Sequence, residues 1–264
     1  MPRSCKALVA VAAVVLALAS CGSDGGDEAS APTTPTGCTA EGEITVAAAA
    51  SLTEAFTTIG DLVEADCPGS TVDITFDSSG KLSEQILSGA PVDAFASADE
   101  ANMEKVADQR EGEPQVFARN RLVIVTEPGN PTGIASLADL ADAGTVALCA
   151  EGAPCGRFAA QALEAAGVEI DESHVTRGAN AKGTLTAVTE GDAVAGIVYV
   201  TDAQAAGDAA DTVEIPDDQN VIATYPIATI DGPGDDDLAE AFVAAVLGEE
   251  GQRALAAAGF LPAT

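Results

Sequence analysis

The sequence predicts an α/β protein with two lobes, each a mostly parallel sheet with flanking helices, and a ligand cleft between the lobes. The chain has 264 residues, which is enough for two lobes. From Ile44 onward, short β-branched runs alternate with segments whose apolar residues recur at helical spacing, and this alternation favours parallel strands joined by helices. Two extended segments, 120–125 and 224–230, are typical of crossings between lobes, so we expect one discontinuous lobe and a hinge.

The first twenty residues have the features of an export signal. Arg3 and Lys6 precede an apolar run, residues 7–19, that is short for a membrane span. The run closes on Leu-Ala-Ser-Cys at 18–21, which resembles a bacterial lipobox, in which cleavage leaves Cys21 as a lipidated N-terminus. An ordinary secretory signal with a chance cysteine is the alternative. We expect an extracytoplasmic protein, held at the outer face of the cytoplasmic membrane only through lipid on Cys21.

Composition and the two crossing segments divide the chain into five parts. The signal peptide is followed by a tether rich in Ser, Thr, Pro, Gly and acidic residues, which we expect to be disordered. The predicted limits are 1–20 for the lipoprotein signal peptide, 21–42 for the tether, 43–120 for the first part of lobe 1, 121–225 for lobe 2 and 226–264 for the C-terminal part of lobe 1.

The net charge of −31 argues against nucleic acid or an anionic membrane surface as partner. It also constrains any anion site, which must rely on local dipoles and hydroxyl groups against an unfavourable overall field. We expect a monomer.

Six cysteines are present, of which Cys5 leaves with the signal and Cys21 would carry the lipid. In an oxidising compartment the four that remain predict two disulfides, Cys38–Cys67 and Cys149–Cys155. The first would join the N-terminal end of the domain to the end of the first helix, and the second would close a short loop. The spacings do not suit a zinc site, because no C-x₂-C pair occurs and His174 is the only histidine.

The first strand, turn and helix run from Ile44 to about residue 63. A β-branched run at 44–46 leads through four alanines to Ser51, and Ser51 with Glu54 forms the S-x-x-E pattern of a capping box. We expect Ser51 at a helix N-terminus, where free N–H groups attract an anion. A cap that serves only its own helix is the alternative.

The rest of the chain continues the alternation. Strands are predicted at 72–76, 92–97, 121–126, 145–148, 174–176 and 194–200. Helices are predicted at 81–87, 99–106, 136–141, 157–166 and 183–189, from 201, and from 235, with a final helix that ends at about 259. Asp99, Thr201-Asp202 and Asp235 are expected at helix starts. Residues 221–230, with Pro226 inside, are expected to form an extended crossing segment rather than a central strand.

Five strand-to-helix turns follow predicted parallel strands, at 50–51, 78–80, 154–156, 180–182 and 199–201. Open α/β sheets bind ligands at the carboxyl ends of such strands. These turns offer the hydroxyl groups of Ser51, Ser79 and Tyr199 and the N–H groups of helix starts. All of these donate without carrying charge, so together they would hold an oxyanion without a counter-charge.

At these turns the chain resembles the periplasmic molybdate-binding proteins of bacterial ABC importers. The similar segments, in order, are AAASLTEAF (48–56), FDSSGKLSEQILSGAPVDAFASAD (76–99), APCGRFAAQAL (153–163) and GIVYVTDA (196–203). The resemblance covers about residues 43–260. It implies a class II periplasmic-binding fold that closes on molybdate or tungstate and delivers it to membrane permease subunits, with no enzymatic activity and no cofactor.

The resemblance also implies which residues bind the ligand. They are the side chains of Ser51, Ser79 and Tyr199 and the backbone N–H groups of Cys155 and Ala181. Molybdenum would be present only within the bound molybdate. The chain departs from the family in having a cysteine at 155, where a small residue is common, and Asn-Ala-Lys at 180–182, where an acidic-apolar-basic triplet is common. We expect the Asp77 side chain to point away from the site.

Two other functions compete with this one. A binder of another tetrahedral oxyanion, such as sulfate, on the same fold is the near alternative, because hydrogen-bond donors select deprotonated oxyanions and only cavity size would separate sulfate from molybdate. A secreted serine hydrolase using Ser51 or Ser79 is the distant one, since G-x-S-x-G is missing from the sequence and His174 would be its only base. Lys81 and Lys182 are expected on helix surfaces, not as ligands.

Overall fold

The computed structural model describes residues 38–264, so the predicted signal peptide, Cys21 and most of the tether lie outside the described residues. The strands are β1 (Gly42–Ala49), β2 (Ser70–Asp77), β3 (Ala94–Ala96), β4 (Arg110–Thr126), β5 (Val146–Cys149), β6 (Val175–Gly178), β7 (Ala195–Tyr199), β8 (Asp211–Glu214) and β9 (Ile222–Ile230). The α-helices are α1 (Thr53–Asp66), α2 (Ser79–Leu87), α3 (Glu100–Lys105), α4 (Pro154–Ala166), α5 (Ala181–Thr189), α6 (Val200–Ala206), α7 (Asp236–Leu247) and α8 (Glu249–Ala257). Short 3₁₀ turns are η1 (Ala50–Leu52), η2 (Leu137–Asp142), η3 (Glu172–His174) and η4 (Gly207–Ala209).

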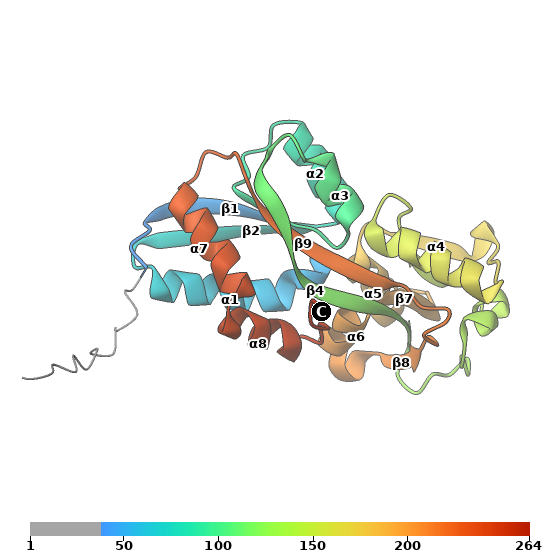
Figure 1. The fold of residues 1–264 in the computed structure, drawn as a ribbon. Helices are drawn as coiled ribbons and strands as arrows, with labels where there is room; N and C mark the ends of the chain where they lie inside the picture. The colour runs from blue at the N-terminus through green and yellow to red at the C-terminus, as the bar shows by residue number, and fades with distance from the viewer. Residues whose placement is uncertain (1–37) are drawn as a thin grey trace, which may run out of the picture. The chain divides into compact units, whose positions relative to one another are not determined.

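The strands form one sheet in the order β2-β1-β3-β9-β4-β7-β5-β6, with β8 also paired to β4 (Figure 1). The pairs β1–β2, β1–β3, β5–β6 and β5–β7 are parallel, as the strand-helix alternation predicts. The central pairs β3–β9, β9–β4 and β4–β7 are antiparallel. Strand β4 is 17 residues long: it pairs with β9 as far as Arg121 and with β7 and β8 from there on, so it joins the two groups of strands.

Helices cover both faces of the β2-β1-β3 group. Side chains alternate along β1, so that Val46 and Ala48 pack into the same cluster as α1 and α7, while Ala47 packs with Leu82 of α2 and Met103 of α3. In Figure 1, α1, α7 and α8 lie together on one side and α2 and α3 on the other. No helix within residues 38–264 is long and apolar enough to span a membrane.

The prediction for residues 221–230 is wrong, because β9 is a central strand hydrogen-bonded to β3 and to β4. Pro226 is tolerated there because the β4–β9 ladder shifts register between Val116 and Ala118, next to its partner position. The missing N–H therefore falls where regular pairing is already interrupted. The Pro226 carbonyl still accepts a hydrogen bond from the Ser97 N–H at 3.0 Å.

The capping box predicted at Ser51 is also wrong. Helix α1 begins at Thr53, and its N-cap residue, Leu52, makes no side-chain capping hydrogen bond. Ser51 lies one residue earlier, inside the buried turn η1, and its hydroxyl group is hydrogen-bonded to Tyr225 at 2.8 Å. The hydroxyl is therefore directed toward the sheet and not toward its own helix.

Of the other predicted helix caps, two are confirmed and one is wrong. Asp99 and Asp235 cap α3 and α7, each accepting a hydrogen bond at 2.9 Å from the N–H three residues on. The cap predicted at Thr201-Asp202 is wrong, because α6 begins at Val200 with Tyr199 as its N-cap. Asp202 instead accepts a hydrogen bond from the Tyr199 N–H at 3.2 Å.

Both predicted disulfides are present in the structure. Cys38–Cys67 joins residues 29 positions apart, and ties the start of the described chain to the end of α1. Cys149–Cys155 spans six positions and ties the end of β5 to the first turn of α4. The second bond therefore fixes one of the turns that the sequence singles out.

Candidate functional site

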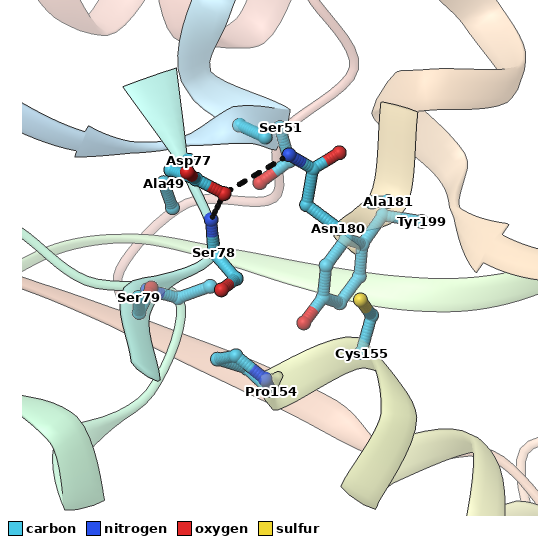
Figure 2. Close-up of a pocket in the computed structure, with 12 residues that line it drawn as sticks. Ala49, Ser51, Asp77, Ser78, Ser79, Pro154, Cys155, Asn180, Ala181 and Tyr199 are labelled. Carbon is cyan, nitrogen blue, oxygen red and sulfur yellow. Dashed lines mark hydrogen bonds between the residues drawn. The ribbon is translucent and has the colours of Figure 1, made fainter. Parts of the chain in front are cut away.

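The five residues predicted to bind the ligand line one small cavity (Figure 2). The space open to the centre of a water-sized sphere is about 10 Å³, roughly what a single water molecule needs. The lining comes from strand ends and helix starts: Ala49, Ala50, Ser51, Asp77, Ser78, Ser79, Ala98, Pro154, Cys155, Asn180, Ala181 and Tyr199. Small side chains predominate, so the backbone comes close to whatever occupies the cavity.

Ser79 is the first residue of α2, which follows the carboxyl end of β2, and its side chain is fully buried. Its Oγ accepts a hydrogen bond from the backbone N–H of Ala98 at 2.9 Å. Since a backbone N–H can only donate, the Ser79 hydroxyl keeps its own hydrogen for another acceptor. The residue is therefore a hydrogen-bond donor toward the cavity.

Tyr199 ends β7 and points its hydroxyl group toward the space beside Ser79 and Pro154 (Figure 2). The side chain is only 2% exposed, and its Oη has no hydrogen-bond partner among residues 38–264. Burial, with smaller effects of Tyr225 and Asp202, raises the pKa of Tyr199 well above its ordinary value, so the phenol keeps its hydrogen. A buried hydroxyl without a partner costs about 1–3 kcal/mol, which a ligand acceptor in the cavity would recover.

The backbone donors come from α4 and α5. Helix α4 begins with Pro154, which has no N–H to offer, so Cys155 supplies the first free N–H of that helix. Ala181 does the same for α5, whose N-cap Asn180 accepts a hydrogen bond from the Gly183 N–H at 2.9 Å. First-turn N–H groups have no partner within their own helix, and the helix dipole adds positive potential there. Such positions favour an anion.

Asp77 lines the cavity, so the expectation that its side chain points away is wrong. Its Oδ1 accepts hydrogen bonds from the Ser78 N–H at 2.8 Å and from Asn180 Nδ2 at 3.3 Å, and Lys81 bonds to the other oxygen (Figure 2). Burial opposes ionisation of this carboxyl group, but the hydrogen bonds outweigh it and hold the pKa of Asp77 below its ordinary value. Its lone pairs are thus engaged by protein donors.

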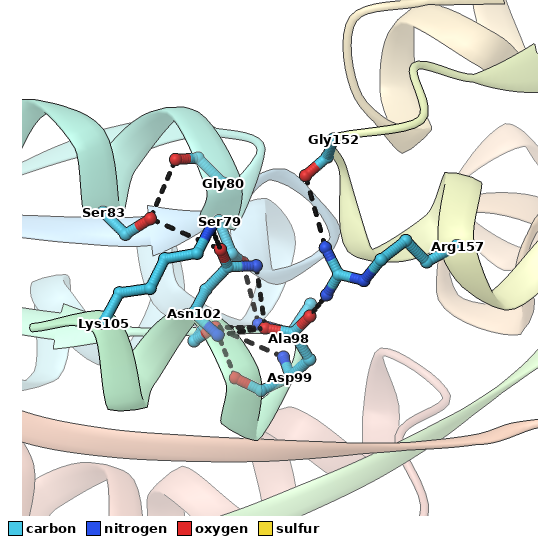
Figure 3. Close-up of polar contacts among 10 residues, drawn as sticks. Ser79, Gly80, Ser83, Ala98, Asp99, Asn102, Lys105, Gly152 and Arg157 are labelled. Atoms are coloured by element: carbon cyan, nitrogen blue, oxygen red, sulfur yellow. Dashed lines mark hydrogen bonds and ion pairs between the residues drawn. The ribbon is translucent and has the colours of Figure 1, made fainter.

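Three polar contacts join opposite sides of the cavity, and the sequence analysis missed all three. Each pairs a residue before position 120 with one after position 150: Asp77 with Asn180, Glu54 with Lys182, and Asp99 with Arg157. Figure 3 shows the third, in which Arg157 also donates to the Gly152 carbonyl at 3.4 Å. A single sequence carries no signal for such pairs, because their members lie far apart in the chain.

Backbone contact also joins the two sides. A Cβ atom added at Gly80 would lie 2.4 Å from the Gly152 carbonyl oxygen, a distance that side chains do not tolerate. Gly156 is similarly confined, since a Cβ there would meet the Ala150 carbonyl oxygen at 2.2 Å. Gly80 therefore allows α2 to begin close to the loop before α4 on the other side of the cavity, whereas Gly156 allows α4 to begin close to the end of β5 on its own side.

The positively charged side chains near the cavity lie outside its lining. Among the described residues no lysine or arginine lines it, and Lys81 and Lys182 pair with Asp77 and Glu54 at the surface. Within residues 38–264, no group of three or more His, Cys, Asp or Glu side chains is arranged to hold a metal ion. The site therefore presents uncharged donors, and what it can do chemically is bind a small anion.

Comparison with known proteins agrees with this geometry. Residues 44–261 match the family described as bacterial extracellular solute-binding protein. Over 252 residues the chain is 38% identical to the molybdate-binding protein ModA of Mycobacterium tuberculosis, covering 94% of each protein. It is also 29% identical to a putative ABC transporter substrate-binding lipoprotein, YvgL, of Bacillus subtilis, over 61% of this chain and 64% of the relative.

A solved structure has the same fold. The periplasmic molybdate-binding protein of Azotobacter vinelandii superposes with a TM-score of 0.74 over 83% of this chain and 98% of that chain, at 21% identity. The predicted periplasmic-binding fold is therefore confirmed. Taken together, these matches place the chain among the bacterial extracellular solute-binding proteins, which are not enzymes, and it belongs to the family of the molybdate-binding protein ModA.

Proposed function

We propose that this protein captures molybdate, and tungstate with it, outside the cytoplasm and delivers it to the membrane subunits of an ABC importer. The observation that supports the proposal is the lining of the cavity, which includes three residues with hydroxyl groups, residues from the first turns of two helices and, among the described residues, no lysine or arginine. The 38% identity to a molybdate-binding protein over 94% of the chain supports the choice of ligand.

In this proposal the hydroxyl groups of Ser51, Ser79 and Tyr199 and the N–H groups of Cys155 and Ala181 donate to the oxygen atoms of the dianion. A hydrogen bond to a charged acceptor contributes about 1.5–3 kcal/mol. Five such bonds are ample for tight binding after the entropic cost of association. The donors carry no charge, so in this proposal hydrogen bonds hold the dianion without a cationic side chain, in a protein of net charge −31. Molybdenum enters only as part of the bound oxyanion.

Binding requires the cavity to open. A tetrahedral oxyanion has five heavy atoms, whereas the space available to the centre of a water-sized sphere is about 10 Å³. We propose that lobe 1, residues 43–120 with 226–264, and lobe 2, residues 121–225, separate to admit the ion and close over it. The contacts of Asp99 with Arg157 and of Glu54 with Lys182 would then break and form again.

The lipid anchor belongs to the same proposal. Cleavage before Cys21 and its lipidation would hold the protein at the outer face of the cytoplasmic membrane, near the importer. The tether that follows, within residues 21–42, would let the domain reach the permease as a monomer. Mass spectrometry of the exported protein tests this, because a diacylated Cys21 adds a mass that a Cys21→Ser variant cannot carry.

Isothermal titration calorimetry tests the ligand. We expect one molybdate or tungstate to bind tightly per protein, and sulfate and hydrogenphosphate to bind far more weakly, sulfate because it is smaller and hydrogenphosphate because it carries a proton. Tight binding of sulfate with no heat from molybdate would instead favour a sulfate-binding protein on the same fold.

A further inference from the structure

We infer that Tyr225 is a positioning residue of the oxyanion site, which fixes the Ser51 hydroxyl as a donor toward the ligand and so selects oxyanions that carry no proton. The inference rests on the proposed function, since it concerns the direction of one hydrogen bond in that site. Tyr225 lies on β9 and does not line the cavity. It is one of two tyrosines in the chain, and the other is Tyr199.

The bond between Ser51 Oγ and Tyr225 Oη is 2.8 Å long, and either oxygen can donate in it. If Ser51 donated to Tyr225, the serine would present only lone pairs to the cavity and would repel an oxyanion. If Tyr225 donates to Ser51, the serine hydrogen is free to point at the ligand. The position of the Tyr225 hydrogen therefore decides whether Ser51 can bind an anion.

Asn120 settles that position. Its Oδ1 accepts the Arg121 N–H at 2.9 Å, so its Nδ2 faces the other way, toward Thr201 Oγ1 at 2.9 Å and Tyr225 Oη at 3.5 Å. An amide nitrogen donates and does not accept. Of the two groups within 3.5 Å that hydrogen-bond to Tyr225 Oη, Ser51 Oγ is thus the one that can take the phenol hydrogen.

The burial of Tyr225 favours this direction. Tyr225 is fully buried, and a buried donor without an acceptor is costly. Burial also raises the pKa of Tyr225 above its ordinary value, so the phenol keeps its hydrogen. Tyr225 therefore donates to Ser51, and the chain of donors runs from Asn120 through Tyr225 and Ser51 into the cavity.

Ser79 has the same arrangement on the neighbouring turn. Its Oγ accepts the Ala98 N–H, which can only donate, and its hydrogen is left for the cavity. Both serine hydroxyl groups thus accept a hydrogen bond from the protein and donate their own hydrogen toward the cavity. A deprotonated oxyanion suits such a site, whereas hydrogenphosphate brings a hydrogen that needs an acceptor the serines do not provide.

The Tyr225 ring cannot move away from Ser51. It makes edge-on contacts with the rings of Phe117, Phe260 and Tyr199, at centroid distances of 6.2, 5.2 and 6.0 Å. A Tyr225→Phe change keeps this packing and removes only the hydroxyl group. It therefore isolates the hydrogen bond from the fold.

The test compares Tyr225→Phe with the wild type for molybdate, sulfate and hydrogenphosphate, with the weaker anions measured by displacement of molybdate. Without the phenol, the Ser51 hydroxyl can turn and accept. We expect molybdate and sulfate to weaken by the same factor, about three- to tenfold, and the preference for sulfate over hydrogenphosphate to shrink by about tenfold. Because both anions are titrated into one preparation, loss of folded protein leaves this ratio unchanged.

Tyr199→Phe is the matched control, since it removes one phenol that faces the ligand directly. It should weaken all three anions and leave the sulfate-to-hydrogenphosphate ratio as in the wild type. In a Ser51→Ala background, Tyr225→Phe should no longer alter the ratio. Equal weakening of sulfate and hydrogenphosphate by Tyr225→Phe, or no effect, would overturn the inference. A wild-type protein that binds none of the three anions would overturn the proposed function, and this inference with it.

Discussion

Arg157, in the first turns of α4, forms an ion pair with Asp99, which caps α3 on the opposite side of the cavity. Asp99 is nearly buried, and it directly follows Ala98, whose N–H fixes the Ser79 hydroxyl. Two adjacent residues therefore serve both purposes: Asp99 makes the contact across the cavity, and Ala98 orients the Ser79 hydroxyl, a predicted ligand donor. Figure 3 shows this continuity, from Ser79 through Ala98 and Asp99 to Arg157.

Arg157→Met should favour the open form of the protein. The change removes the ion pair and leaves Asp99 without its partner on α4, so closure gains less free energy. We expect molybdate affinity to fall by about three- to tenfold, which corresponds to about 0.7–1.4 kcal/mol, and the radius of gyration without ligand to rise in X-ray scattering. Arg253→Met is the matched control, because the ion pairs of Arg253 within residues 38–264 are with Glu249 and Glu250 of its own helix, α8. If the two variants behaved alike, the pair would have no role in closure.

Ser51→Ala and Ser79→Ala should each raise the dissociation constant for molybdate by about ten- to a hundredfold, from the loss of about 1.5–3 kcal/mol per bond. Ser83→Ala is the control, since Ser83 is an equally buried serine of α2 that does not line the cavity. Calorimetry gives the affinities.

Variants of Lys81 and Lys182 test the alternative that positive charge holds the ligand. Lys81→Ala and Lys182→Ala should affect affinity much less, and added salt should matter little, because buried donors are poorly screened. Loss of binding in the lysine variants, with both serine variants intact, would show that charge and not hydrogen bonding holds the ion.

Asp202 should make the protein less stable as the pH rises. Burial raises the pKa of Asp202 from its ordinary value of 3.8 to about 7, against smaller opposing effects of the Tyr199 N–H and Lys182. The folded state therefore binds a proton that the unfolded state has released, so stability is fully present below about pH 4 and is lost as the pH rises through 7. The loss amounts to about 4 kcal/mol, at about 1.4 kcal/mol per pKa unit.

Asp202→Asn removes this titration and keeps an oxygen for the Tyr199 N–H. Urea unfolding of both proteins from pH 4 to pH 8 should show the variant gaining stability relative to the wild type as the pH rises. Parallel curves would mean that the carboxyl group titrates near its ordinary pKa when folded.

The two disulfides should differ in what they contribute. Replacing Cys38 and Cys67 by serine should cost about 3–4 kcal/mol of unfolding free energy, and replacing Cys149 and Cys155 only about 2 kcal/mol, because the second loop is shorter. Molybdate affinity should fall only in the second variant, since that bond fixes the turn carrying the Cys155 N–H. Equal affinities in the two variants would contradict this role.

What the sequence predicts correctly depends on local pattern and on parallel topology. The helix caps at Asp99 and Asp235 are local signals, and they are confirmed. The five predicted ligand residues lie at the carboxyl ends of strands in two parallel groups, β2-β1-β3 and β7-β5-β6, which the strand-helix alternation implies, and the turns of both groups line one cavity.

The features that the sequence does not predict depend on contacts between residues that are far apart in the chain. The S-x-x-E pattern at Ser51 predicts a capping box, but the hydroxyl is engaged by Tyr225, 174 positions away. Pro226 argues against a central strand in the sequence, and only the register shift beside it in the β4–β9 pair explains why the strand is possible. The pair Asp99–Arg157 and the bond between Asp77 and Asn180 join segments whose proximity only the folded chain defines.

The central position of β9 has a consequence for the order in which the chain can fold. Strand β3 is complete at Ala96, but its second neighbour, β9, begins only at Ile222, after every other strand has been made. During synthesis and export the β2-β1-β3 group therefore keeps an open edge, of the kind that pairs readily with other chains. The sheet closes only when nearly the whole chain has emerged, and such long-range pairing slows folding. An exported protein gains from that delay, because translocation requires a chain that has not yet folded.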